Sequence, residues 1–108
     1  YRDRVRTLLH DVDVLIPAAT PCPATPIGTE WIDLGGRKLP LRASLGVLTQ
    51  PVSCIGLPVL AAPIPEPRAL PIGVQIIAAP WREDLCFRVA AALAASGVAA
   101  SPLPPIRA

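Results

Sequence analysis

The apolar stretch at residues 48–80, LTQPVSCIGLPVLAAPIPEPRALPIGVQIIAAP, constrains the fold more than any other part of the chain. Its first part predicts a short helix. Gly56 is placed to take the left-handed position after the last turn, and Pro58 prevents the helix from continuing. Two apolar runs follow this helix, so the stretch changes from helical to extended structure within a few residues.

The two apolar runs predict neighbouring strands. Residues 59–64 are apolar without interruption, which is typical of a strand buried on both faces. After a Pro/Glu/Arg loop, residues 72–79 predict a second strand with one polar interruption, Gln75. Gly73 inside that strand indicates a bulge or a close approach of another backbone. Helix, strand, loop and strand in this order predict the layered sheet of an α/β enzyme.

The rest of the chain predicts shorter elements around this sheet. Gly35-Gly36 between two short runs is the signal of a two-residue hairpin, and Pro40 then belongs on its exposed edge. Glu83 and Asp84 favour the start of a closing helix, because carboxylates are stabilised at the positive end of the helix dipole. The expected bounds are 1–9 for a first helix, 14–17 for a strand, and 31–34 and 37–41 for the hairpin. A helix is expected at 42–55, and Pro51 should kink or restart it. The closing helix is expected at 83–97, with a buried stripe of Leu85, Val89 and Leu93 beside Cys86 and Ala90. Residues 1–97 are thus expected to form the packed segment, and 98–108 a loose Pro-rich tail.

The order of four motifs resembles the C-terminal part of the amidase signature family. TQPVSCIGLPVLAAP, LPIGVQIIAAP and DLCFRVAAAL match the family pattern TxPxNxxGLPAxxxP, GLPxGxQxxG and a closing helix. DVLIPAATP at residues 13–21 is similar to the family's segment that leaves a strand beside the substrate channel. The resemblance covers most of residues 1–97. It implies an α/β fold in which this chain is the C-terminal portion, with a mixed β-sheet covered by helices.

The catalytic residues of that family have no counterpart in these motifs. The family uses a Ser nucleophile, a second Ser in a cis peptide and a Lys, in an upstream Lys segment and a Gly/Ser-rich loop. Here Ser44, Ser53, Ser96 and Ser101 are isolated, and Lys38, the only lysine, lies beside the Gly-Gly turn. We therefore expect no catalytic residue in this chain, which would be a cut domain or a truncated product of an amidase and inactive alone.

The motifs also indicate a branch of the family. Amidotransferase A subunits carry an Asp shortly before the TxPxNxxGLP motif, where this chain has Gly46 between Leu45 and Val47. EWIDLGGRKLPLR followed by ASLGVLTQPVSCIGLPV resembles instead the carboxybiuret-hydrolase branch, which acts on small urea-derived amides, and Ser53 in place of the common Asn fits that branch. Two alternatives stay open: the A subunit of a glutamine-dependent tRNA amidotransferase, and a truncated interaction protein without catalysis.

The resemblance implies that this chain forms one wall of the substrate pocket. The residues it places there are Thr20, Cys22, Arg42, Ile55 and Gly56. Arg42 is the cation close to the helix that borders the channel in the family, so it would bind a substrate carboxylate through a bidentate pair. The other interpretation of Arg42 is a solvated side chain at a helix start.

Composition and charge limit the partners. The net charge is +2, and the basic residues gather only at Arg2, Arg4 and Arg6, which form a solvated helix face or a patch for an acidic partner. Three cysteines without close pairs predict no zinc site and fit a reducing compartment and small apolar packing roles. The full-length enzyme is accordingly expected in the cytoplasm, without cofactor, membrane segment or direct nucleic-acid contact. It would form a homo- or hetero-oligomer, which the resemblance extends to a small helical protein similar to the amidotransferase C subunit.

Overall fold

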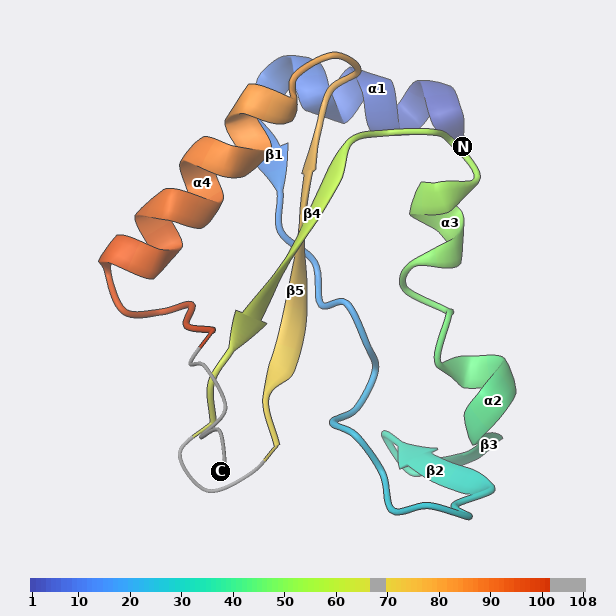
Figure 1. The fold of residues 1–108 in the computed structure, drawn as a ribbon. Helices are drawn as coiled ribbons and strands as arrows, with labels where there is room; N and C mark the ends of the chain where they lie inside the picture. Colours follow the sequence, from blue (N-terminus) through green and yellow to red (C-terminus); the bar gives the residue numbers. More distant parts are fainter. Residues whose placement is uncertain (67–69, 102–108) are drawn as a thin grey trace.

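The computed structural model of the protein describes residues 1–66 and 70–101. In chain order the elements are α1 (Arg2–Asp11), β1 (Val14–Leu15), β2 (Trp31–Leu34), β3 (Arg37–Pro40), α2 (Leu41–Ser44), α3 (Gln50–Ser53), β4 (Val59–Ile64), β5 (Ile72–Ala78) and α4 (Glu83–Ala95). One three-stranded sheet, in the order β1-β5-β4, lies between helix α4 and a second group of elements made of the β2–β3 hairpin and the short helices α2 and α3 (Figure 1). The layered α/β arrangement that the sequence predicted is therefore present.

The central strands of the described chain pair in a regular antiparallel register. β4 pairs with β5 from Val59↔Ile77 to Ile64↔Ile72, and β1 pairs with the other edge of β5 at Val14↔Ala78. These pairings, like the β2–β3 hairpin, are antiparallel. The described strands thus supply only the antiparallel part of a sheet.

The prediction that residues 59–64 are buried on both faces is wrong for the described residues. Leu60 and Ile64 pack toward α4, whereas Val59 on the other face is 42% exposed, and Ala61 and Pro63 are exposed too. Side chains alternate between the faces of a strand, and only one face of β4 is covered. An unbroken apolar run indicates that the side chains on both faces of the strand are apolar. It does not indicate which of the two faces another element covers.

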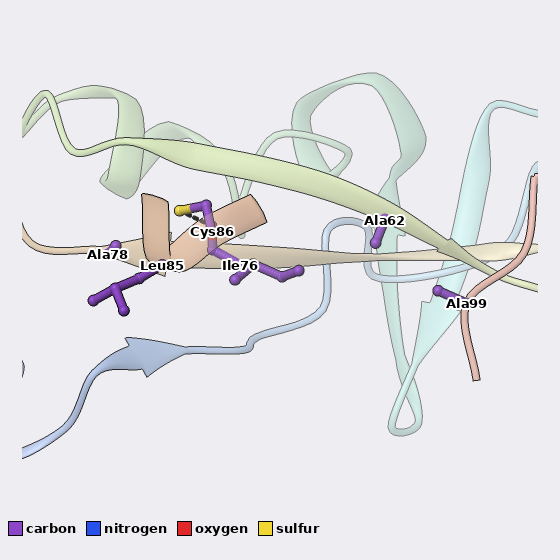
Figure 2. Packing of buried hydrophobic residues seen from close by; sticks show 6 residues of the cluster. All are labelled: Ala62, Ile76, Ala78, Leu85, Cys86 and Ala99. Carbon is purple, nitrogen blue, oxygen red and sulfur yellow. Dashed lines mark hydrogen bonds between the residues drawn. The ribbon is translucent and has the colours of Figure 1, made fainter. Parts of the chain in front are cut away.

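The core lies between α4 and the sheet. Figure 2 shows how its buried side chains meet: Ala62 from β4, Ile76 and Ala78 from β5, Leu85 and Cys86 from α4, and Ala99 beyond α4. The predicted stripe of α4 is confirmed, because Val89, Ala90 and Leu93 pack against this cluster.

Two predicted glycine turns are confirmed. Gly35 and Gly36 have φ of 61° and 79°, and the Gly36 N–H donates to Asp33 Oδ1 at 2.8 Å, which closes the β2–β3 turn. Gly56 has φ of 64° and is the last residue of the turn that follows α3. Glycine adopts these left-handed conformations without the steric cost that a Cβ brings.

The helix expected at residues 42–55, with a kink or a new start at Pro51, is present as two one-turn helices, α2 and α3. The chain turns at Gly46, where a Cβ would lie 2.9 Å from the Gln50 side chain. Pro51 lies in the first turn of α3, where a missing N–H costs nothing, so α3 starts afresh as one of the two expected outcomes.

The first residues of the predicted loose tail, 98–100, are hydrogen-bonded to the packed part of the chain. Val98 and Ala99 donate their N–H groups to Leu93 O, both at 3.0 Å, and Ala100 N–H donates to Pro63 O at 3.2 Å. The packed part therefore extends to Ala100. Residues 102–108 of the expected tail, and residues 67–69 of the expected loop, lie outside the described residues.

Candidate substrate-pocket wall

The predicted pocket residues lie on the two segments that flank the sheet on the side away from α4. One segment is the loop after β1, which we call the β1 loop (residues 16–30), and the other runs from α2 to the turn after α3, the α2–α3 segment (residues 41–57) (Figure 1). Prolines interrupt the β1 loop, and Gly46, Pro51 and Gly56 interrupt the α2–α3 segment, so neither forms long regular structure.

The β1 loop holds Thr20 and Cys22 close together. Thr20 Oγ1 donates to the carbonyl of Cys22 at 2.9 Å, which fixes the turn between them. The loop is tied to β5 by Ala19 N–H, which donates to Gly73 O at 2.8 Å. A Cβ on Gly73 would lie 3.2 Å from that of Ala19, so the predicted close approach at Gly73 is confirmed.

Arg42 lies in α2 with an exposed side chain. Among residues 1–66 and 70–101, the ion pair present joins Arg82 to Asp84, and none involves Arg42. The guanidinium is therefore available to an anionic group, and the structure agrees equally with a solvated side chain.

Ile55 and Gly56 are neighbours in the chain but line different hollows. Ile55, 9% exposed, lines an apolar hollow of about 270 Å³ between α1, α3 and the sheet. Gly56 lines a hollow of about 540 Å³ together with Arg6 and Trp81. Trp81 is 89% exposed and has a φ of 66°, which is rare for a residue with a Cβ.

The five predicted residues therefore do not all line either of these two hollows. Thr20, Cys22 and Arg42 line neither of these two hollows. What the fold does bring together is the two segments that carry them, each against β5.

Sequence reasoning missed the residue that joins these segments, Gln75. Its side chain is 3% exposed, and Nε2 donates to Ala18 O at 3.0 Å and to Leu48 O at 3.1 Å. The signal was present in the sequence as a lone polar residue inside an apolar strand. A buried amide needs partners, and here both come from the candidate wall.

A polar hollow of about 310 Å³ lies elsewhere, between the end of α1 and the start of α4, and is lined by His10, Asp13 and Arg82 among others. Arg82 donates from Nε to Asp84 Oδ1 at 2.9 Å, and this hydrogen bond holds the pKa of Asp84 below its ordinary value. Within the described residues, no three His, Cys, Asp or Glu side chains are grouped to hold a metal ion.

The three thiols differ in their surroundings. Cys86 is buried and contacts Ile76 O at 3.3 Å, and burial raises the pKa of its thiol. Cys22 is half-buried and Cys54 is exposed. The predicted packing role therefore holds for Cys86 and is wrong for Cys54.

Known proteins of similar sequence and structure share one family. The family model described as Amidase matches residues 1–87. The chain is 52% identical over 101 residues to AtzE, a 1-carboxybiuret hydrolase subunit of Pseudomonas sp. (strain ADP), and the alignment covers 92% of this chain and 22% of that protein. It is 36% identical over 95 residues to the A subunit of the glutamyl-tRNA(Gln) amidotransferase of Staphylococcus carnosus (strain TM300), covering 81% and 19%.

A solved structure agrees with these relatives. The chain superposes with a TM-score of 0.88 on a solved structure described as "An unexpected vestigial protein complex reveals the evolutionary origins of an s-triazine catabolic enzyme". The two are 50% identical, and the match covers 95% of this chain and 23% of that one. The chain thus spans about a fifth of the length of the relatives it matches. No helix of the described residues is long and apolar enough to span a membrane. On the family match and these identities, the chain belongs to the amidase family.

Proposed function

We propose that this chain forms part of the substrate-pocket wall of an amide hydrolase that acts on a small, urea-derived amide with a carboxylate. The observation that carries the proposal is the 52% identity to a component of 1-carboxybiuret hydrolase, compared with 36% to an amidotransferase A subunit. Gly46, where amidotransferase A subunits carry an Asp, supports the same choice.

The chemistry would come from outside these motifs. By the family resemblance, a Ser attacks the amide carbonyl to give an acyl-enzyme, while a Lys and a second Ser carry protons. The hydroxyl groups of Ser44, Ser53 and Ser96 donate to main-chain carbonyls of Pro40, Thr49 and Leu93. None of them has a basic side chain as its partner, which supports a role for this chain in binding.

The charge of the substrate follows from Arg42. An exposed guanidinium without an ion-pair partner in the described chain suits a carboxylate, which it binds through two parallel N–H···O bonds. Thr20 and Cys22 would line the opposite wall, and Ile55 and Gly56 the end of α3.

The test is an assay of the complete reading frame that encodes this chain. Purified protein is given 1-carboxybiuret, biuret and glutamine in parallel, and ammonia release is measured. We expect turnover of carboxybiuret, slower turnover of biuret and none of glutamine. Glutamine-dependent amidation of glutamyl-tRNA would favour the amidotransferase alternative, and no ammonia from any of the three would contradict the hydrolase.

We also propose that the complete enzyme works in the cytoplasm with a partner protein. The related 1-carboxybiuret hydrolase chain is one component of a larger enzyme, and the similar solved structure is of a protein complex. Three free cysteines, Cys22, Cys54 and Cys86, suit a reducing compartment. A small helical protein that resembles the amidotransferase C subunit is the partner we expect to co-purify.

A further inference from the structure

The buried amide of Gln75 stands between the two walls of the proposed pocket. Both hydrogens of its Nε2 are used, at 3.0 Å to Ala18 O in the β1 loop and at 3.1 Å to Leu48 O in the α2–α3 segment. Both partners are carbonyl oxygens, so the amide has one orientation that satisfies them. The other buried polar residue of the described chain, Ser44, bonds only to Pro40 O, four residues earlier.

The two walls depend on Gln75 to different degrees. The β1 loop has further bonds to β5, because Ala19 N–H donates to Gly73 O and the main-chain N–H of Gln75 donates to Pro17 O, both at 2.8 Å. For residues 41–57 the bond to Leu48 O is the hydrogen bond that reaches the three-stranded sheet, as far as the described residues go. Leu48 lies two residues before α3, so this bond joins the main chain just ahead of α3 to β5.

Packing alone holds α3 weakly. It is a single turn, and the side chains buried on it and just after it are Val52 and Ile55. The hollow of about 270 Å³ lies directly beside them. A wall with a gap behind it can shift unless a directional bond holds it.

We propose that Gln75 is a positioning residue, which sets the separation of the two walls and so the width of the substrate pocket. The proposal rests on the function proposed above. Without the amide, the carbonyls of Ala18 and Leu48 lose their partners in a site with little water, and moving α3 outward to hydrate Leu48 O becomes favourable. Substrate binding should suffer, while the reacting groups outside these motifs keep their own geometry.

The experiment compares three variants of the complete enzyme. Gln75→Leu removes the amide at similar size, and we expect KM to rise about ten- to a hundred-fold with kcat changed much less. Gln75→Glu keeps the shape but turns a carboxylate toward two carbonyl oxygens. Its KM should also be high at neutral pH and recover in part as the pH falls, because a protonated carboxyl donates one hydrogen bond. Val89→Ala is the control, since it loosens the core on the opposite face of the sheet.

The outcomes separate a positioning role from general destabilisation. Gln75→Leu and Val89→Ala are compared for Tm and KM together. If KM rises equally in both at equal loss of Tm, or if Gln75→Glu lacks the recovery at low pH, Gln75 is merely structural and the proposal is overturned.

A second measurement needs no activity, so it distinguishes this proposal from failure of the proposed function. Hydrogen exchange reports the amides of α3, where Cys54 N–H donates to Gln50 O at 3.0 Å. We expect faster exchange at residues 50–55 in Gln75→Leu and not in Val89→Ala. Unchanged exchange in Gln75→Leu would overturn the positioning role even if the wild-type enzyme hydrolyses no amide.

Discussion

Single side chains on the two faces of the sheet have opposite environments. Cys86 of α4 and Ile76 of β5 are buried where α4 packs on the sheet, whereas Arg42 and Cys54 are exposed on the side of the candidate wall. Gln75 is the buried polar residue of the sheet, as far as the described strands go. Reactivity and charge recognition are therefore expected of the second face, and packing roles of the first.

Arg42→Ala in the complete enzyme should weaken the use of carboxylated substrates. A charged hydrogen bond contributes about 1.5–3 kcal/mol, so kcat/KM for carboxybiuret should fall roughly ten- to a hundred-fold and change little for a neutral amide. Arg42→Lys should restore only part, because an ammonium lacks the planar fork. Arg37→Ala, an exposed arginine of β3, is the matched control. Equal losses on charged and neutral amides would show that Arg42 is structural.

Cys86 should resist alkylation in the folded enzyme. Burial raises the pKa of its thiol, and the reactive thiolate is therefore scarce and covered. Iodoacetamide at pH 8 followed by mass spectrometry should modify Cys86 far more slowly in native protein than in urea. The raised pKa also affects the free energy of unfolding. This free energy should fall as the pH rises above about 8.5, the thiol pKa in the unfolded chain, because only the unfolded state then releases the proton. Equal native and unfolded rates would contradict this environment.

At the scale of elements, the turn of the β2–β3 hairpin determines how its two strands pair. The position of the α2–α3 segment depends instead on contacts with other elements. The hairpin has its own paired register from Trp31↔Pro40 to Leu34↔Arg37. Lys38 Nζ lies 5.4 Å from the centre of the Trp31 ring, a cation–π contact across the hairpin. This local set of contacts explains why the hairpin could be predicted.

Substitution of Gly36 should destabilise the hairpin by conformation alone. No atom lies within 4 Å of a Cβ built there, but its φ of 79° is costly for residues with a Cβ. We expect Gly36→Val to lower the free energy of unfolding by about 1–2 kcal/mol, and Gly36→Asn by less, because Asn tolerates the left-handed region. Thermal unfolding of the complete enzyme gives the comparison. Equal effects of Val and Asn would rule out a left-handed turn.

At the scale of the whole molecule, the described residues bury one face of β4 and leave the other bare. Val59, Ala61 and Pro63 lie on that bare face, and β4 is also an edge strand of the three-stranded sheet. Exposed apolar strands at an edge associate with other chains.

The isolated 108-residue chain should therefore associate or unfold without a sharp transition. Sedimentation velocity over a range of concentrations measures the association. Val59→Lys should reduce it, because a charge on an exposed strand face opposes pairing. A monomer with a cooperative transition at low and high concentration would contradict the expectation.

The isolated chain should also show no amidase activity. Lys38, its one lysine, lies against Trp31, and the hydroxyls of Ser44 and Ser53 are bonded to main-chain carbonyls. Purified chain is assayed on small amides and carboxybiuret. Turnover that persists through purification and is lost in Ser44→Ala or Ser53→Ala would disprove this.

The sequence by itself determined the features that depend on neighbours in the chain. The Gly35-Gly36 turn, the left-handed Gly56 and the apolar stripe of α4 each follow from local sterics or from helical period, and each is present. The order of four short motifs also predicts the family, and the family match over residues 1–87 confirms this prediction.

Only the tertiary structure decided what depends on residues far apart. Which face of β4 is covered depends on where α4 packs, and the apolar run at residues 59–64 does not indicate the position of α4. The partners of Gln75 lie 57 and 27 positions away at Ala18 and Leu48, so its role could not be read from its neighbours. The physical reason is the same in both cases: local sequence fixes backbone conformation and periodicity, whereas burial and hydrogen-bond partners are settled by long-range packing.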